Sequence, residues 1–539
     1  MHIRSVQQPA SKIGTFRGIR FDPIAAALFL IGVLLLLWTS RLNFLSQDAN
    51  WDLLNYHAYD PASLFGGTWL TDIHPAGGGS YVNPNQDLLF WPLVSGIPSP
   101  IGSAILIAIQ VSIFIPVGLI IRTLLPAISR PRAFGLGLVG LSGAMVATEL
   151  GTTMGDIPPA LLLAWSLYLL LSVIAQEPVR AERRAVIAGL LVGGAVALKY
   201  TVIYTFPGLL VFVIALVLAG KRRSAALFFV TSAAVAIVLC GPWAVVLQTH
   251  MGSPVFPMFN GFFHAPRIQA IDMGDARFPI VNLPGLLKLP IRQALGTAYT
   301  AEEYPQDIRW LIGFVAVGLG AAAVAFAVFK RRTRPSWRSN LPGLTLMAFW
   351  CVSYVAWAFI FGTQRYAVLL EVLALPVIAF GLWLALPPLA ARRASLPTLL
   401  LLVVFMAGTT RIVDFGRRPM DWSPIIPSET IEPLTRYDAI LVGGEPLASL
   451  RAVTRDAPGA SRQLWVGAPF DAADAAVEKG AIAGRSVGVI FYTYQHDGAA
   501  VAAANLGLVM TEDCAFFDSP LYNSVGLGAV ELCAAKPSS

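Results

Sequence analysis

The sequence has few charged residues for its length. Asp, Glu, Lys and Arg make up 13% of 539 residues, whereas soluble domains carry about 25%. Hydrophobic residues make up 56%, and the mean hydropathy is +0.66. The shortage of charge excludes a mainly soluble chain and predicts that most of it lies in lipid.

Several site signatures are also missing from the sequence. It has no P-loop, no GxSxG elbow and no Rossmann fingerprint between a strand and a helix. Its six histidines show neither HxxxH nor HExxH spacing, which argues against a dedicated zinc site. Of only four cysteines, Cys240 and Cys351 lie in apolar runs and are expected to pack there. Cys514 and Cys533 can form a disulfide if the tail lies outside the cytoplasm.

The net charge of +7 does not indicate nucleic-acid binding, because the basic residues form short clusters between apolar runs. We predict about eleven transmembrane helices from these runs. They cover residues 22–40, 101–121, 133–150, 157–175, 185–201, 203–219, 225–247, 310–329, 343–361, 366–386 and 395–413. The first is no cleaved signal, because it is long and lacks a small-residue cleavage site. Basic clusters occupy every second loop, which places the N-terminus, residues 1–21, in the cytoplasm.

Three segments then lie on the opposite, non-cytoplasmic side: outer loops 41–100 and 248–309, and residues 414–539. The transmembrane domain covers residues 22–413. We expect the aromatic-rich outer loops to lie on the membrane surface as short amphipathic helices. The polar tail alternates strand patterns (437–444, 464–466, 486–493, 529–533) with helix patterns (445–454, 499–506). This predicts a small C-terminal α/β domain. Arg417 and Arg418 are exceptions to the charge rule on this side.

The first outer loop opens with acidic and aromatic residues, QDANWDLLNYH. Asp48 and Asp52 are four apart, so a helix would place them on one face where the first span leaves the bilayer. A partly desolvated carboxylate there can act as a base. Tyr56 and His57 are candidate substrate-binding residues. The alternative is that the Asp residues only end the apolar span.

Two further outer turns carry ionisable residues. Glu149 and Asp156 flank ELGTTMGDIPP, where Asp156 also fits a helix N-cap with proline in the first turn. Lys199 and Tyr200 end another span on the outer side. A lysine there either snorkels to the headgroups or binds a lipid-borne phosphate.

Arg365 and Tyr366 lie between two late spans, on the same side. Arginine suits bidentate phosphate binding, and headgroup anchoring is the alternative. Glu371, inside the next span, needs a partner, for which Arg365 is a candidate.

Five stretches together resemble the GT-C class of membrane glycosyltransferases. They are QDANWDLLNYHAYDP, TTMGDIPPALLLAWSLYLLL, GGAVALKYTVIYTFPGLL, GPWAVVLQTHMGSPVFPMFN and GTQRYAVLLEVLALP, within residues 20–413. The resemblance implies an acidic base in the first outer loop, which maps onto Asp48 or Asp52. The family's tight acidic pair is replaced here by D-x-x-x-D. A divalent cation, Mg²⁺ or Mn²⁺, therefore stays open as a cofactor.

The resemblance further implies inverting transfer of a hexose or pentose from a polyprenyl-phosphate carrier at the periplasmic face of a bacterial inner membrane. The acceptor would be a lipid, a glycan or a protein. Two non-catalytic alternatives stay open. A transporter or flippase of lipid-linked sugars predicts charges deep in the bundle and broken helices. An assembly factor predicts a tail that retains function alone.

Overall fold

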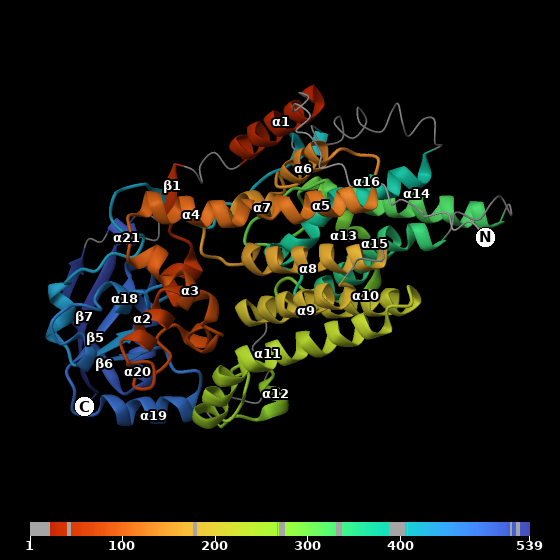
Figure 1. The fold of residues 1–539 in the computed structure, drawn as a ribbon. Helices are drawn as coiled ribbons and strands as arrows, with labels where there is room; N and C mark the ends of the chain where they lie inside the picture. The colour runs from red at the N-terminus through yellow and green to blue at the C-terminus, as the bar shows by residue number, and fades with distance from the viewer. Residues whose placement is uncertain are drawn as a thin grey trace, which may run out of the picture.

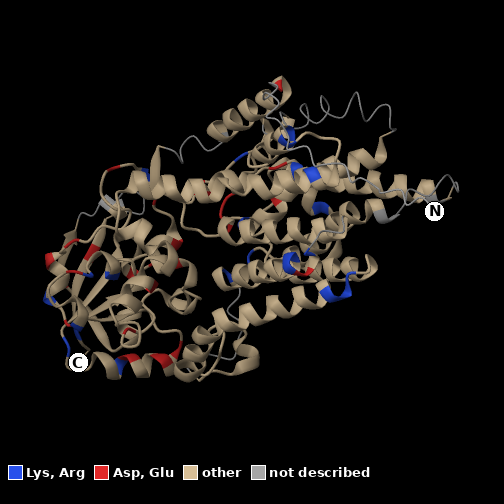
Figure 2. Ribbon diagram, in the orientation of Figure 1, with Lys and Arg blue, Asp and Glu red and all other residues tan. Residues whose placement is uncertain are grey.

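The computed structural model describes residues 22–39, 45–175, 180–266, 268, 275–329, 337–386, 405–406, 408–517, 520–523 and 529–538. It consists of a bundle of long helices with a small domain built around a sheet at one end (Figure 1). Charged residues are spread over this end domain and are sparser along the long helices (Figure 2). The protein is thus a polytopic helical membrane protein with a C-terminal α/β domain, as predicted from the sequence.

Seven helical stretches in the described part of the chain are long and apolar enough to cross a membrane. They are Ser99–Leu124, Ile157–Ala175, Tyr200–Leu218, Arg222–Met251, Arg309–Ala327, Ser339–Ile360 and Gln364–Ala385. The apolar helix Pro23–Trp38 is shorter. The span expected over residues 395–413 falls largely outside the described residues.

Most elements of the bundle follow the predicted apolar runs, but the predicted spans 133–150 and 185–201 are not among these seven stretches. The helices are α1 (Pro23–Thr39), α4 (Ser99–Val111), α5 (Phe114–Leu124), α6 (Arg130–Val139), α7 (Ala144–Glu149), α8 (Ile157–Ala175), α9 (Ala181–Leu198), η3 (Tyr200–Thr205), α10 (Phe206–Leu218), α11 (Arg222–Met251), α14 (Arg309–Phe329), α15 (Trp337–Ile360), η4 (Gln364–Ala367) and α16 (Val368–Ala385). Outside the bundle, η1 (Leu53–His57), α2 (Tyr59–Phe65), η2 (Gly77–Tyr81) and α3 (Asn85–Ser95) form the first outer loop, and α12 (Asn260–Phe263) and α13 (Leu283–Leu295) the second.

The run 133–150 is two helices rather than one span. A buried carboxylate explains the break, because Glu371 of α16 accepts hydrogen bonds from the amides of Met145 (3.1 Å) and Val146 (3.0 Å) in the first turn of α7. A Cβ at Gly143 would lie 1.8 Å from Glu371 Oε1, so only glycine fits. The suggested pairing of Glu371 with Arg365 is therefore wrong: this carboxylate binds backbone amides that a straight helix would have used internally.

Helices α9 and α11 pack closely through two glycines one turn apart. A Cβ at Gly189 would lie 2.7 Å from the Phe228 carbonyl oxygen, and one at Gly193 would lie 2.6 Å from Val235 Cβ. Small residues at this spacing let membrane helices approach backbone to backbone. This packing sets the position of the outer end of α9, where Lys199 follows.

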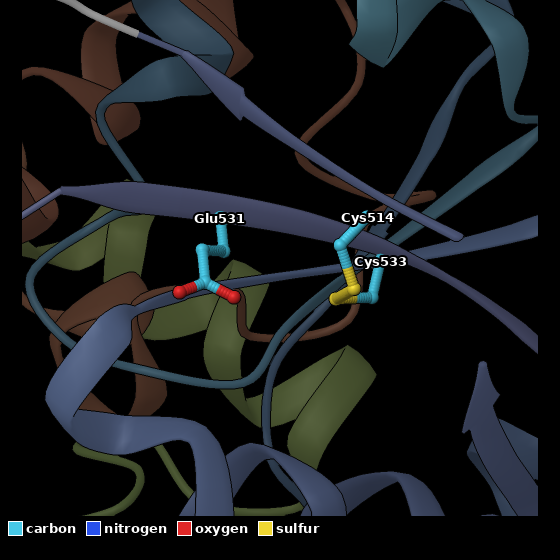
Figure 3. A group of neighbouring side chains, drawn as sticks. All are labelled: Cys514, Glu531 and Cys533. Atoms are coloured by element: carbon cyan, nitrogen blue, oxygen red, sulfur yellow. A yellow bond between two sulfur atoms is a disulfide. The ribbon is translucent and has the colours of Figure 1, made fainter. Parts of the chain in front are cut away.

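The C-terminal domain contains a five-stranded sheet in the order β4-β3-β5-β7-β6. Its elements are η5 (Glu432–Arg436), β3 (Ala439–Val442), α18 (Leu450–Val453), η6 (Ala460–Arg462), β4 (Leu464–Val466), α19 (Ala472–Ile482), β5 (Val487–Tyr492), η7 (Thr493–Gln495), α20 (His496–Asn505), β6 (Leu508–Phe517), α21 (Pro520–Asn523) and β7 (Val530–Pro537). Strand β3 runs parallel to β4 and β5, and β7 runs antiparallel to β5 and β6. A disulfide joins Cys514 of β6 to Cys533 of β7 (Figure 3).

The first outer loop packs against this domain, whereas the sequence led us to expect short amphipathic helices on the membrane surface. Leu53 and Leu54 are fully buried in one core with residues of the C-terminal domain, among them Ile426 and Leu450. Strand β1 (Ser46–Asp48) pairs with β2 (Arg417–Pro419), and Ile73 bridges to Val466 of β4. The second loop fits the amphipathic expectation better. Helix α13 exposes leucine and isoleucine side chains along one face: Leu283, Leu287, Ile291 and Leu295.

Candidate active site

An ion pair between the first outer loop and the start of the last described membrane span forms the centre of the site. Arg365 Nη1 lies 2.5 Å from Asp52 Oδ2, and both side chains are about nine-tenths buried. Asp52 directly precedes η1, a π-helical turn, and Arg365 lies in η4. π-Helical turns are rare and often found at functional sites. The two residues are 313 positions apart in the sequence, so the fold brings them together.

A second ion pair lies beside the first. Lys199 Nζ, just past the end of α9, is 2.8 Å from Asp156 Oδ1 at the start of α8. It also donates to the Met154 carbonyl at 2.6 Å. Asp156 thus pairs with a lysine rather than capping its own helix, and Lys199 turns inward rather than snorkelling. Both cations approach the ring of Tyr366: Lys199 at 5.4 Å and Arg365 at 5.2 Å from its centroid.

Sequence reasoning missed the residues that hold these pairs in place. Asn83 and Asn85 donate to the Ala197 carbonyl at 2.7 and 3.2 Å, which fixes the last turn of α9 before Lys199. Gln86 lies against Gly155, where a Cβ would be 1.5 Å from its amide nitrogen. The stretch NPNQD (83–87) was the available signal, because it places five polar or turn-forming residues at the start of an apolar helix, the last three of them in the first turn of α3.

His57 and Asp87 form a buried dyad next to these pairs. His57 Nδ1 is 2.7 Å from Asp87 Oδ1, and in the described part of the chain His57 Nε2 has no hydrogen-bond partner. The Tyr56 ring lies 4.2 Å from the His57 ring, centroid to centroid. Burial raises the pKa of Asp87, although His57 opposes this. Tyr56 and His57 therefore belong to the same cluster as Asp52, as the loop pattern suggested.

Asp48 has different surroundings from Asp52. It lies in β1, not on a helix with Asp52, so the expected shared helix face is wrong. Its carboxylate accepts hydrogen bonds from the backbone and side chain of Thr153, both at 2.7 Å, and from the backbone (3.2 Å) and side chain (2.8 Å) of Asn50. A fully buried carboxylate with this many donors holds the loop to the 149–156 turn and has little capacity left for substrate.

Glu149 and Tyr200 are placed less centrally. Glu149 ends α7 and is 1% exposed, and among the described residues neither carboxylate oxygen has a hydrogen-bond partner. Tyr200 is not brought into the cluster, because its hydroxyl neighbours the Cys240 thiol on α11. The structure thus gathers Asp52, Tyr56, His57, Asp156, Lys199, Arg365 and Tyr366, with Glu149 at the edge of the cluster, where the charges of Asp156, Lys199 and Arg365 act on it.

The electrostatics of Asp52 depend on its cationic neighbours. Burial raises the pKa of this carboxyl and is the largest single effect, but the charge and hydrogen bond of Arg365, together with the charges of His57 and Lys199, outweigh it and hold the pKa at about 2. Asp52 is therefore ionised at neutral pH and available to accept a proton.

The site does not offer a ready cage for a metal ion. Within the residues described, no three His, Cys, Asp or Glu donor atoms in this cluster come within 4.8 Å of one another. Asp52 is held by Arg365, and Asp48 by Asn50 and Thr153. A Mg²⁺ or Mn²⁺ ion held by one of these aspartates together with a substrate phosphate stays a prediction.

Comparison with known proteins shows the fold. No family model and no curated protein matches the sequence. The structure is similar to the crystal structure of ArnT from Cupriavidus metallidurans bound to undecaprenyl phosphate, with a TM-score of 0.51 and 12% identity, covering 94% of this chain and 97% of that one. Apo ArnT from the same organism gives a TM-score of 0.42 at 13% identity, over 95% of this chain and 98% of that one. The apo oligosaccharyltransferase of Archaeoglobus fulgidus gives 0.43 at 14%, over 89% and 72%. The similarity to the first confirms the predicted GT-C fold.

Proposed function

We propose that the protein is a glycosyltransferase that moves a sugar from a polyprenyl-phosphate carrier to an acceptor hydroxyl. One observation carries the proposal: a buried carboxylate and two cations, Asp52, Arg365 and Lys199, meet where the membrane helices end against the outer loop. The neighbour with the similar fold was crystallised with undecaprenyl phosphate. A lipid-borne phosphate suits this position, because its chain stays in the bilayer while its charge reaches the helix ends.

Asp52 is the base in this proposal, in preference to Asp48. Arg365 holds only one of its two oxygens, Oδ2, so Oδ1 is left to accept a proton. The acceptor hydroxyl loses its proton to Asp52 as its oxygen attacks the anomeric carbon. The bond from that carbon to the phosphate oxygen breaks, and the polyprenyl phosphate leaves with the bonding electron pair. A single displacement inverts the anomeric centre and needs no protein nucleophile.

Arg365 and Lys199 stabilise the leaving phosphate. A guanidinium can bind two phosphate oxygens at once, and an ammonium adds a second charge. Negative charge on the phosphate grows as its bond to the anomeric carbon breaks, so this interaction is stronger in the transition state than in the bound donor and lowers the barrier. The contact of Arg365 with Asp52 lowers the basicity of Asp52. A donor phosphate that draws Arg365 away therefore makes Asp52 a stronger base.

The orientation in the membrane belongs to the same proposal. The basic clusters place the N-terminus in the cytoplasm and the site at the periplasmic face of a bacterial inner membrane. The disulfide in the C-terminal domain supports this, because disulfides persist in oxidising compartments. The acceptor in this proposal is a hydroxyl of a lipid, a glycan or a protein.

Substitution of the two aspartates tests the proposal. In liposomes holding the full-length protein and a polyprenyl-phosphate sugar, Asp52→Asn should lower the rate of sugar transfer by about 10² to 10⁴-fold. Asp48→Asn should mainly lower the melting temperature, since its hydrogen bonds hold the loop. Sugar transfer at the wild-type rate by both variants, at normal expression, would sink the assignment. Donor movement across the liposome membrane without product would instead indicate a transporter.

A further inference from the structure

A second cluster of ionisable side chains lies outside the candidate active site. His74 Nε2 is 2.7 Å from Asp474 Oδ2 and 2.8 Å from Glu478 Oε1. All three side chains are 0% exposed. One nitrogen and two carboxylate donors lie within 4.8 Å of one another.

The cluster joins two distant parts of the chain. His74 belongs to the first outer loop, between α2 and η2, and Asp474 follows it by 400 positions. Asp474 and Glu478 are one turn apart on α19, so they point to the same side of that helix. The ring of Phe470 stacks on His74 at 4.4 Å and covers the imidazole.

Hydrogen bonds within the cluster do not satisfy its donors and acceptors. Asp474 Oδ2 accepts from His74 Nε2 and from the Phe470 amide. A single N–H serves one acceptor well, and both Glu478 oxygens and Asp474 Oδ1 are left without a hydrogen-bond partner among the described residues. Two ionised carboxylates and one imidazolium leave one negative charge unbalanced, which a bound cation would neutralise.

We infer that His74, Asp474 and Glu478 bind a divalent cation that fastens the first outer loop to the C-terminal domain. One imidazole nitrogen and two carboxylate oxygens suit Zn²⁺ best among the common ions. Tetrahedral Zn²⁺ holds its ligands about 2.0 to 2.2 Å away, and hence about 3.3 Å from each other. The three side chains would need to separate by about half an ångström, and a second carboxylate oxygen or a water completes the shell.

The site would act on the candidate active site by positioning. The chain leads from His74 into η2, and a Cβ at Gly79 in this turn would lie 2.9 Å from Tyr56 Cδ1. The ring of Tyr56 lies beside that of His57, and Tyr56 follows Asp52 by one turn. A metal ion at His74 therefore fixes the segment against which this part of the loop packs.

Metal analysis of the full-length protein tests the inference. We expect about one zinc ion per chain after purification in detergent without chelator. Glu478→Gln and His74→Ala should lose the zinc. Asp471→Asn is the matched control, because Asp471 caps the same helix at Ala473 and Asp474 without entering the cluster. It should keep the zinc, since asparagine caps helices as well as aspartate does.

The melting temperature is a second measure of zinc binding, which can also be applied to variants that fold poorly. A chelator should lower the melting temperature of the wild type and of Asp471→Asn, and added ZnCl₂ should restore it. Glu478→Gln, which keeps the shape of the side chain, should respond to neither. The site would be overturned if the wild-type protein contains no zinc and neither chelator nor ZnCl₂ changes its melting temperature. The proposed sugar transfer could still hold in that case.

Discussion

Two aspartates four residues apart in the first outer loop have opposite environments. Asp48 is enclosed by hydrogen-bond donors from Asn50 and Thr153, whereas Asp52 faces one cation, Arg365. A carboxylate that accepts many hydrogen bonds is stabilised as a structural anion, while one with a free oxygen can take up a proton. The difference lies in their partners, not in the residue type or its spacing.

The ion pair predicts how activity depends on pH. Removal of the Arg365 charge takes away the strongest effect that opposes burial of Asp52, so its pKa should rise from about 2 in Arg365→Gln. As pH falls, this variant should protonate its base and lose kcat/KM, whereas the wild type keeps Asp52 ionised. The measurement is kcat/KM for sugar transfer between about pH 5 and 8, which reports on the free enzyme.

A matched control for this profile is Arg277→Gln. Arg277 is about half exposed and pairs with Asp275 and Glu302 rather than with a residue of the cluster. Its loss should leave the pH profile unchanged. An Arg365→Gln enzyme whose profile has the same shape as that of the wild type would contradict the coupling between Arg365 and Asp52.

The residue types of the site could be read from the sequence, but their pairing could not. Charge alternation placed Asp52, Lys199 and Arg365 on one side of the membrane. Which carboxylate meets which cation depends on loop geometry, so Lys199 with Asp156 and Arg365 with Asp52 emerged only from the structure. The sequence likewise did not indicate that His57 pairs with Asp87, which lies 30 positions later.

At the scale of elements, apolar runs predicted helices well and their interruptions poorly. The predicted span 157–175 coincides with α8. The run 133–150 has no charged residue before Glu149, yet Glu371 from another helix interrupts it at Gly143. In the C-terminal domain, β4 was placed correctly, but α19 and β6 were missed because neither shows a clean period. Hydropathy identifies segments that are buried in lipid, but it does not identify a side chain from a distant helix that interrupts such a segment.

The glycine contact of α9 with α11 supports an element-scale prediction. Gly193→Ala places a methyl group 2.6 Å from Val235 Cβ, which should cost about 1 to 3 kcal/mol of stability and displace Lys199. Gly194→Ala on the same helix meets Leu162 at 3.6 Å, an ordinary contact, and should be tolerated. Melting temperature and transfer rate of the two variants check this. Equal effects at both positions would show that the close approach is unimportant.

At the scale of the whole molecule, the C-terminal domain and the first outer loop form one structural unit. They share a core that includes Leu53 and Leu54, and β1 pairs with β2 across them. Composition could separate a polar tail from an apolar bundle, but it could not show that the tail covers the loop that carries Asp52. The His74 cluster was hidden for the same reason, since its ligands are 400 positions apart.

Truncation at residue 419 should therefore disable the protein. The cut exposes Leu53 and Leu54 at a cost of about 1.5 to 3 kcal/mol each and leaves the Asp52 segment unsupported. We expect little folded protein by size-exclusion chromatography and no sugar transfer. Glycan output restored by the separate tail alone would instead support an assembly factor.

The central claim is that Arg365 binds the donor phosphate and Asp52 performs the proton transfer. Binding of polyprenyl phosphate and single-turnover sugar transfer, measured side by side in Asp52→Asn, test it most directly. The variant frees Arg365 from its carboxylate, so it should bind polyprenyl phosphate at least as tightly as the wild type while transfer falls by about 10² to 10⁴-fold. Transfer at the wild-type rate, or binding lost together with transfer in a folded variant, would contradict the claim.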